Sequence, residues 1–213
     1  MIPVIRLMSI FGRKKVFLSA CIYSILLIGL CIFSISEEIF FLFSFASFCL
    51  GATVATMMQF RFAAIESVNQ DQRASATEVV LLGGLISAFL GTEIATIGKS
   101  ILDTEFVGSF LLLALLFIIA FVLMFFFEPA VKFKEQIEKS KRPLLSIIQQ
   151  GSFVVAVSAA TTGYVVMSFI MTATPVSMHV MDGHSLHHTK LVLQSHVIAM
   201  FLPSLFTAYI VKY

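Results

Sequence analysis

Six long hydrophobic runs make up most of the chain, and short polar segments separate them. The runs cover residues 16–34, 39–60, 77–98, 107–127, 147–173 and 190–211. Each is close to the ~20 residues that a helix needs to cross the hydrocarbon core of a membrane. Inside lipid every backbone polar group must be bonded within the protein, and a helix achieves this within one segment. The pattern therefore predicts an all-α, multi-pass transmembrane helical bundle of about six membrane-spanning helices.

The composition agrees with a protein that lies in lipid. Hydrophobic residues make up 59% of the 213 residues and charged residues only 12%, with a mean hydropathy of +1.00. Soluble domains carry about 25% charged residues, and a folded surface in water needs more polar cover than this chain supplies. The lipid bilayer is therefore the expected environment. The chain has no basic tail or basic stripe, so no nucleic-acid partner is expected.

The distribution of basic residues predicts the orientation of the chain. If residues 1–15 lie in the cytoplasm, twelve of the fourteen Lys and Arg residues fall on the cytoplasmic side and only Lys99 and Lys190 on the outer side. Cytoplasmic loops of membrane proteins carry an excess of Lys and Arg. The sequence therefore predicts a multi-pass protein of the cell (inner) membrane with both termini of this chain in the cytoplasm.

A polar segment at 128–146 separates four hydrophobic runs from two. It contains five basic residues, and Glu135/Lys139 and Glu138/Arg142 have the i, i+4 spacing of ion pairs on a helix. We interpret this segment as a solvated loop at the cytoplasmic surface. Because the division is unequal, and because both chain ends look cut at the edge of a span, we expect a fragment of a longer chain.

Three stretches resemble sequences of the major facilitator superfamily. Gly12-Arg13-Lys14-Lys15 is similar to the end of its loop between spans two and three. Glu66 and Arg73, seven residues apart, are similar to a charged pair at the inner end of span four in sugar-porter-like members. Residues 172–185 and 195–204 resemble spans seven and eight of one branch of permeases. By this resemblance the chain is an internal fragment of the bacterial twelve-span permease branch, corresponding to about spans three to eight.

The chain also departs from the pattern of this superfamily. The opening loop has Ile5, Ser9 and Ile10 where the full motif has Gly, Asp and Arg. Ser47 stands four residues before Gly51, where proton-coupled members carry an Arg. The resemblance therefore does not imply proton coupling through that position.

The resemblance implies a division into three parts and a function. Residues 1–127 would form the remainder of the N-terminal helical half, 128–146 the cytoplasmic central loop, and 147–213 the start of the C-terminal half. The implied function is secondary active or facilitated transport of a small solute by alternating access, without catalysis or a cofactor. A coupling ion stays open, and no oligomeric state is predicted. The alternative is a truncated or non-transporting membrane protein or subunit.

Two groups of functional residues are expected. By resemblance, an inner latch that holds helices together when the inner side closes would consist of Gly12, Arg13, Lys14, Glu66 and Arg73. The alternative for these residues is ordinary interfacial charge. Candidates for the transport path, in the runs 39–60 and 147–173, are Thr53, Gln59, Thr161, Thr162 and Tyr164. The alternative for the hydroxyls among them is a bond to their own helix backbone.

The third hydrophobic run contains a carboxylate and a set of glycines. Glu93 is the acidic residue that lies well inside a run, and an intramembrane carboxylate is a candidate for proton or cation coupling. The alternative is contact with water, since Glu93 is near the outer end of its run. We expect Gly83, Gly84 and Gly91 to allow close packing of helices. They lack the proline of antiporter members, so an antiporter is not implied.

A histidine box is the basis for a rival hypothesis. His184, His187 and His188 have the HxxHH spacing of membrane di-iron enzymes, and imidazole clusters suit iron or zinc. Such enzymes have about eight histidine ligands in cytoplasmic boxes, whereas this chain has five histidines and its box lies on the predicted outer side. Asp182 and Ser185 are more simply explained as a loop and helix cap. We therefore expect a transporter, with a membrane metal enzyme as the remote alternative.

Overall fold

The computed structural model describes residues 2–128 and 144–205, and these residues form helices without strands. In chain order the helices are α1 (Ile2–Phe11), α2 (Arg13–Ser36), α3 (Phe40–Met57), α4 (Phe60–Glu66), η1 (Gln70–Gln72), α5 (Arg73–Gly98), α6 (Val107–Phe125), α8 (Leu144–Ile148), α9 (Gly151–Pro175), η2 (Val176–Met181) and α10 (Leu186–Leu205). The predicted all-α fold is confirmed.

Five helices are long and apolar enough to cross a membrane within the described residues. They cover residues 13–36, 40–66, 75–98, 107–125 and 151–181, and they match the first five predicted runs. Helix α10 occupies the position of the sixth run, 190–211, of which residues 206–211 lie outside the described residues. Most of the predicted central loop, residues 129–143, also lies outside them.

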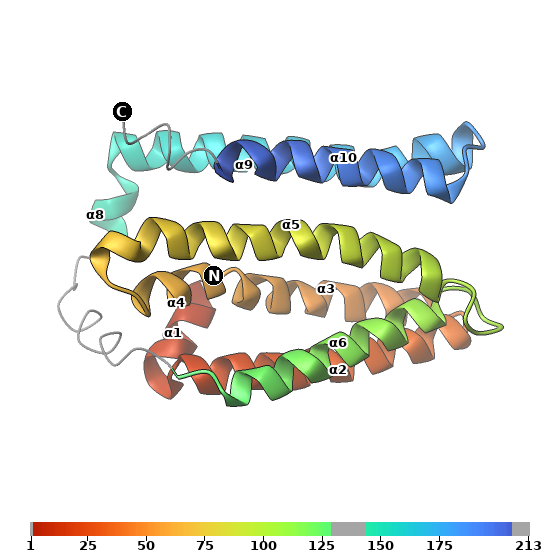
Figure 1. The fold of residues 1–213 in the computed structure, drawn as a ribbon, viewed down its shortest axis with the longest axis horizontal. Helices are drawn as coiled ribbons and strands as arrows, with labels where there is room; N and C mark the ends of the chain where they lie inside the picture. The colour runs from red at the N-terminus through yellow and green to blue at the C-terminus, as the bar shows by residue number, and fades with distance from the viewer. Residues whose placement is uncertain (1, 129–143, 206–213) are drawn as a thin grey trace. The chain divides into compact units, whose positions relative to one another are not determined.

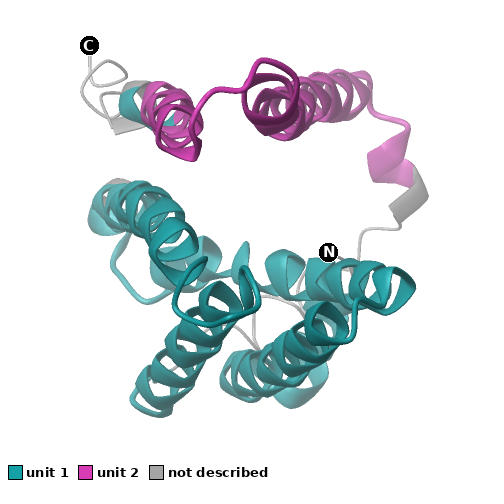
Figure 2. Ribbon diagram, turned by 90° about the vertical axis from the view of Figure 1, so that its right-hand side faces the viewer, with its two compact units in different colours: residues 1–134, 201–213 teal, residues 135–200 magenta. Residues whose placement is uncertain are grey.

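The chain forms two compact units, residues 1–134 with 201–213 and residues 135–200 (Figure 2). In unit 1, α2 is the central helix and packs along both α3 and α6. Its buried residues recur every three or four positions, from Val16 and Phe17 to Ser34, which is the repeat of one helix face. Phe17 is fully buried and stacks on Phe60 of α4, with ring centroids 4.3 Å apart. This stacking fixes α4 against the first turns of α2.

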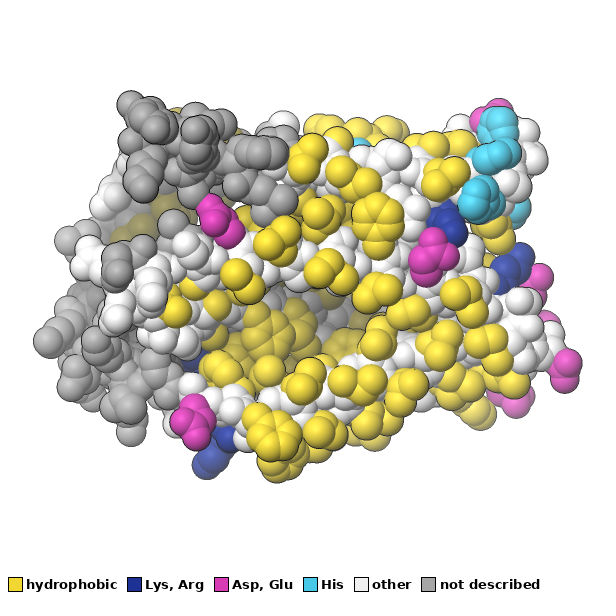
Figure 3. Space-filling view, in the orientation of Figure 1, with side chains coloured by type: hydrophobic (Ala, Val, Ile, Leu, Met, Phe, Trp, Pro, Cys, Tyr) yellow, Lys and Arg dark blue, Asp and Glu magenta, His cyan; other side chains and the backbone are white. Residues whose placement is uncertain are grey.

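Many large hydrophobic side chains are exposed along the helices. Phe41 is 84% exposed and Phe48 81% exposed. Figure 3 shows hydrophobic side chains along the lengths of the helices, with many of the charged and histidine side chains near helix ends. Lipid tails are the solvent that such a surface requires, because water would leave this area unfavourably solvated.

Helices α5 and α6 meet at one end and diverge toward the other (Figure 1). At the contact, a Cβ built on Gly98 would lie 2.4 Å from Ser109 Cα, and one built on Gly108 would lie 2.4 Å from the Gly98 carbonyl oxygen. Only glycine permits this approach. Among the described residues no atom lies within 4 Å of a Cβ built on Gly83 or Gly91, whereas the Phe201 ring lies 3.7 Å from one built on Gly84, so close packing at these glycines stays a prediction.

Unit 2 contains α8, α9, η2 and residues 186–200 of α10. The run predicted at 147–173 is divided at its start, because Gln150 is extended with ψ 125° and α9 begins at Gly151. At its end α9 reaches Pro175, which has no backbone N–H to continue the bonding pattern. The wider turns of the π-helix η2 follow, and the amide of Asp182 donates to the Ser177 carbonyl (2.9 Å).

Candidate functional site

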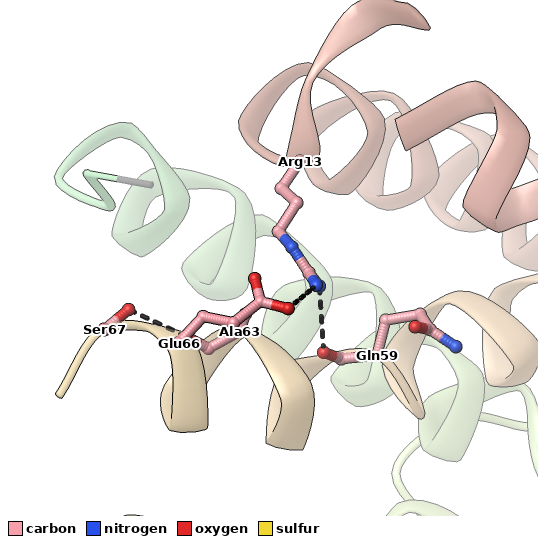
Figure 4. Close-up of polar contacts among 5 residues, drawn as sticks. All are labelled: Arg13, Gln59, Ala63, Glu66 and Ser67. Atoms are coloured by element: carbon pink, nitrogen blue, oxygen red, sulfur yellow. Dashed lines mark hydrogen bonds and ion pairs between the residues drawn. The ribbon is translucent and has the colours of Figure 1, made fainter. Parts of the chain in front are cut away.

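The side chain of Arg13 joins the start of α2 to α4 (Figure 4). Gly12 has φ +83°, a conformation that L side chains rarely adopt, and it separates α1 from α2. Arg13, the first residue of α2, is only 5% exposed. Its Nη2 donates to Glu66 Oε1 at 2.7 Å, and its Nη1 donates to the Gln59 carbonyl oxygen at 3.5 Å. One guanidinium therefore binds the N-cap residue and the last residue of α4.

Lys14 joins the same end of α2 to α6. Its Nζ donates to the carbonyl oxygen of Phe125, the last residue of α6, at 2.6 Å. The carbonyl groups at a helix carboxyl end carry partial negative charge, and a cation there is stabilising. We call Arg13, Lys14 and Glu66, with the carbonyls of Gln59 and Phe125, the Arg13 cluster.

Arg73, the remaining charged residue of the predicted latch, lies apart from this cluster. It is exposed at the start of α5, after the η1 turn. Among the described residues no ion pair joins it to Glu66. The structure thus brings Arg13 and Glu66 together and leaves Arg73 outside, and a role for Arg73 in the latch stays a prediction.

The polar path candidates of the second run are buried in helix contacts of unit 1. Thr53 of α3 is 3% exposed, and its hydroxyl lies 2.8 Å from the hydroxyl of Ser24 on α2. Gln59 is 4% exposed, and its carbonyl oxygen belongs to the Arg13 cluster. Both residues hold α2 against the α3–α4 segment. Sequence reasoning missed Ser24, because nothing in a uniformly apolar run marks the residue opposite Thr53.

The path candidates of the fifth run lie on α9, where they separate into two sets. An open groove of about 1050 Å³ follows one side of α9 and η2, from Val157 to Met181. Thr161 and Tyr164 line it, whereas Thr162 does not. The Thr162 hydroxyl instead donates to the Ser158 carbonyl at 3.0 Å, the backbone bond named above as its alternative role.

Glu93 is half-buried on α5, within the last two turns before the helix ends at Gly98. Its position agrees with the predicted location inside the third run and near one end of it. A coupling role for this carboxylate stays a prediction.

The histidine box lies where η2 passes into α10, and it has a capping geometry. Ser185 Oγ accepts a hydrogen bond from the His188 amide at 3.3 Å, which is the N-cap arrangement for a helix that begins at Leu186. The ring centroids of His184 and His188 are 6.3 Å apart, and His179 Nδ1 lies 2.7 Å from the His184 carbonyl oxygen. No group of three or more His, Cys, Asp or Glu among the described residues is placed to hold a metal ion. The predicted cap at Ser185 is confirmed.

Together, the long apolar helices, their exposed hydrophobic surface and the charged groups at helix ends define a multi-pass helical membrane protein. The chain belongs to the Major Facilitator Superfamily, whose family model matches residues 1–212. The resemblance stated from the sequence is confirmed.

Characterised and uncharacterised transporters are among its relatives. The chain is 35% identical to the riboflavin transporter RfnT of Brucella anthropi, over 97% of this chain and 52% of that protein. It is 34% identical to the uncharacterized MFS-type transporter YddS of Bacillus subtilis, over 76% of this chain and 40% of the relative. It is 30% identical to the uncharacterized MFS-type transporter YdeG of the same organism, over 86% of this chain and 46% of that relative. The chain spans about half the length of these curated relatives, and no solved structure matches it significantly.

Proposed function

We propose that the full-length protein transports a small solute across the cell (inner) membrane by alternating access, and that riboflavin is the first solute to test. The observation that carries this proposal is the 35% identity to a riboflavin transporter over 97% of the chain. Transport is secondary active or facilitated. No nucleotide-binding loop of the P-loop type occurs in the sequence.

In this proposal the groove of α9 forms one wall of the solute path. Two half-bundles that rock about a central site expose that site to one side of the membrane at a time. The lining of the groove is mainly apolar and includes hydroxyl-bearing side chains, which can form hydrogen bonds with a solute. Thr161 and Tyr164 are the sequence-predicted residues that this wall includes.

The Arg13 cluster acts as the inner latch. A charge-assisted hydrogen bond between groups that are 5% and 23% exposed is stronger than one in water. Arg13 and Lys14 are adjacent, so the inner ends of α4 and α6 are held by neighbouring residues of α2. The latch therefore fixes the inner end of this helical group while the inner side is closed.

The test is uptake of radiolabelled riboflavin by riboflavin-requiring bacteria that produce the full-length protein. We expect saturable uptake and growth at low external riboflavin, compared with cells that carry an empty vector. Membrane insertion of the protein without uptake above that control would contradict the riboflavin proposal. Cells that produce only the 213 residues form a second arm, because the alternative of a non-transporting chain predicts insertion without uptake there.

The orientation is tested by single cysteines at Ser140 and Ser185 in a cysteine-free background. An impermeant thiol reagent applied to intact cells is expected to label position 185 and not position 140. The reverse pattern would place the histidine box in the cytoplasm and contradict the orientation derived from the basic residues.

Coupling through Glu93 is tested with Glu93→Gln, which keeps the size of the side chain and removes its charge. If Glu93 carries the coupling ion, riboflavin uptake loses its dependence on an imposed pH gradient. Uptake that keeps the same pH dependence would exclude this role.

A further inference from the structure

Three exposed histidines gather where η2 passes into α10. His184 follows a turn at Gly183, which has φ +69°, and His187 and His188 lie in the first turn of α10. The ring centroids of His184 and His188 are 6.3 Å apart, and those of His187 and His188 are 6.1 Å apart. Figure 3 shows histidine side chains close together on the surface. All of these residues belong to unit 2.

Hydrogen bonds fix the backbone that carries His184 and His188. The His184 amide donates to the Met178 carbonyl at 2.8 Å, and the His184 carbonyl lies 2.7 Å from Nδ1 of His179. The His188 amide donates to Ser185 Oγ at 3.3 Å. A defined backbone beneath two exposed side chains is the kind of support that holds ligands in place at a binding site.

His179 supports His184 as an outer-shell residue supports a metal ligand. Because a carbonyl oxygen only accepts, Nδ1 of His179 carries the ring proton in this contact. Hydrogen bonds of this kind orient the residues that bind metal ions. Asp182, whose carboxylate accepts from Ser177 Oγ at 3.4 Å, stands two positions before His184. Its negative charge favours a cation over an anion at this end of α10.

The separation of the His184 and His188 rings is close to that of two imidazoles on one metal ion. With metal–nitrogen bonds of about 2 Å in a tetrahedral arrangement, two such ring centroids lie about 5 Å apart. The rings therefore need to approach by about 1 Å, which rotation of two exposed side chains supplies. His187 and His188 are adjacent, so their side chains leave the helix about 100° apart and are less suited to share one ion.

Two imidazoles define the class of metal ion. Neutral imidazole suits Zn²⁺, Cu²⁺ and Ni²⁺, whereas Mg²⁺ and Ca²⁺ prefer oxygen ligands. For a given set of nitrogen ligands the affinity is highest for Cu²⁺. Two protein ligands leave the remaining positions of the ion to water. Such a site differs from the centre of a di-iron enzyme, and it agrees with the finding that no group of three or more ligands is placed together among the described residues.

We propose that His184 and His188 form a binding site for one divalent transition-metal ion, with Cu²⁺ bound more tightly than Zn²⁺ or Ni²⁺. The bound ion joins the turn after η2 to the first turn of α10, and it stabilises this junction because it binds the folded arrangement of the two rings. Neither histidine lines the α9 groove, and the inference does not depend on the proposed solute.

The first test is titration of the purified full-length protein, without a polyhistidine tag, with Cu²⁺ and with Zn²⁺. We expect His184→Gln and His188→Gln each to weaken binding by about tenfold or more, since even the loss of a supporting residue costs that much at other metal sites. His187→Gln, at the neighbouring exposed position, is the matched control and is expected to leave the affinity unchanged. Equal weakening by all three variants would mean an adventitious ion only, and no weakening by any of them would place the ion elsewhere. Either result overturns the proposal.

The second test counts the ligands and checks the fold. Pulsed electron paramagnetic resonance of the Cu²⁺ complex is expected to show two imidazole nitrogens, and a single imidazole would overturn the proposal. Zn²⁺ is expected to raise the thermal unfolding midpoint of the unsubstituted protein and not that of His188→Gln. Without metal the two proteins are expected to unfold at the same temperature, because His188 is exposed. An equal Zn²⁺ shift in both would overturn the proposal.

Discussion

Arg13 and Glu66 are 53 positions apart in the chain, and their side chains meet at 2.7 Å. Arg13 is 5% exposed and Glu66 is 23% exposed, so the pair is largely shielded from water. Removing one member of such a pair leaves the other charge uncompensated, which costs more than the pair itself contributes. The contact ties the start of α2 to the end of α4, and this makes it the most direct target for mutation.

Glu66→Gln is expected to lower the stability of the protein in detergent by about 2 kcal/mol and to reduce riboflavin uptake at least tenfold. The physical reason is the uncompensated guanidinium of Arg13. Thermal unfolding and initial uptake rates measure the two effects. The double variant Arg13→Glu with Glu66→Arg is expected to recover part of both, because it restores opposite charges across the contact.

Arg73→Gln is the matched control for this pair. Arg73 is exposed and forms no ion pair with Glu66 among the described residues, so its loss is expected to leave stability unchanged. A loss of uptake as large as that of Glu66→Gln would show that Arg73 belongs to the latch in another state of the transporter.

Lys14→Met is expected to lower stability by about 1 kcal/mol. The variant keeps the length of the side chain and removes the donor to the Phe125 carbonyl. Lys15→Met removes the same charge from the neighbouring, exposed position and is expected to have no such effect. Thermal unfolding of the two purified variants gives the comparison, and equal midpoints would show that the helix-end contact contributes nothing.

Gly98→Ala is expected to destabilise the contact of α5 with α6 by about 2 kcal/mol. The new Cβ would meet backbone atoms of Ser109 at 2.4 and 2.5 Å, which cannot move aside as a flexible side chain can. Gly83→Ala on the same helix has open space around its Cβ and is expected to be neutral or slightly stabilising. If Gly98→Ala and Gly83→Ala lower the unfolding temperature in detergent equally, the assigned contact between α5 and α6 is contradicted.

Thr53→Val is expected to reduce stability by about 0.6 kcal/mol and to leave KM for riboflavin unchanged. The reason is that Thr53 is bonded to Ser24 between α2 and α3. A double-mutant cycle with Ser24→Ala isolates the pair, since the second mutation should add little once the first is made. A rise in KM for Thr53→Val would instead return Thr53 to the solute path.

The sequence identified candidate site residues by their type and their place in the hydrophobic pattern. It identified only in part which of these residues contact one another. The resemblance to the superfamily predicts Arg13 and Glu66 as members of one latch, and the structure brings their side chains together. Thr161 and Thr162 are neighbours with identical side chains, and sequence reasoning treated them alike. The structure separates them, since a turn of 100° between successive helix positions puts one in the groove and the other outside it.

The sequence by itself determined that the chain is a bundle of membrane helices and where the first five spans lie. Length and hydrophobicity decide this, because lipid forces each span to satisfy its own backbone and leaves few other structures available. Tertiary structure decided which residues of each span face each other. In a run such as 16–34 nearly all residues are apolar, so composition does not mark the face that carries Phe17 and Ser24. That choice depends on the shapes of α3 and α6 packed against α2, and shape complementarity is a property of the assembled helices.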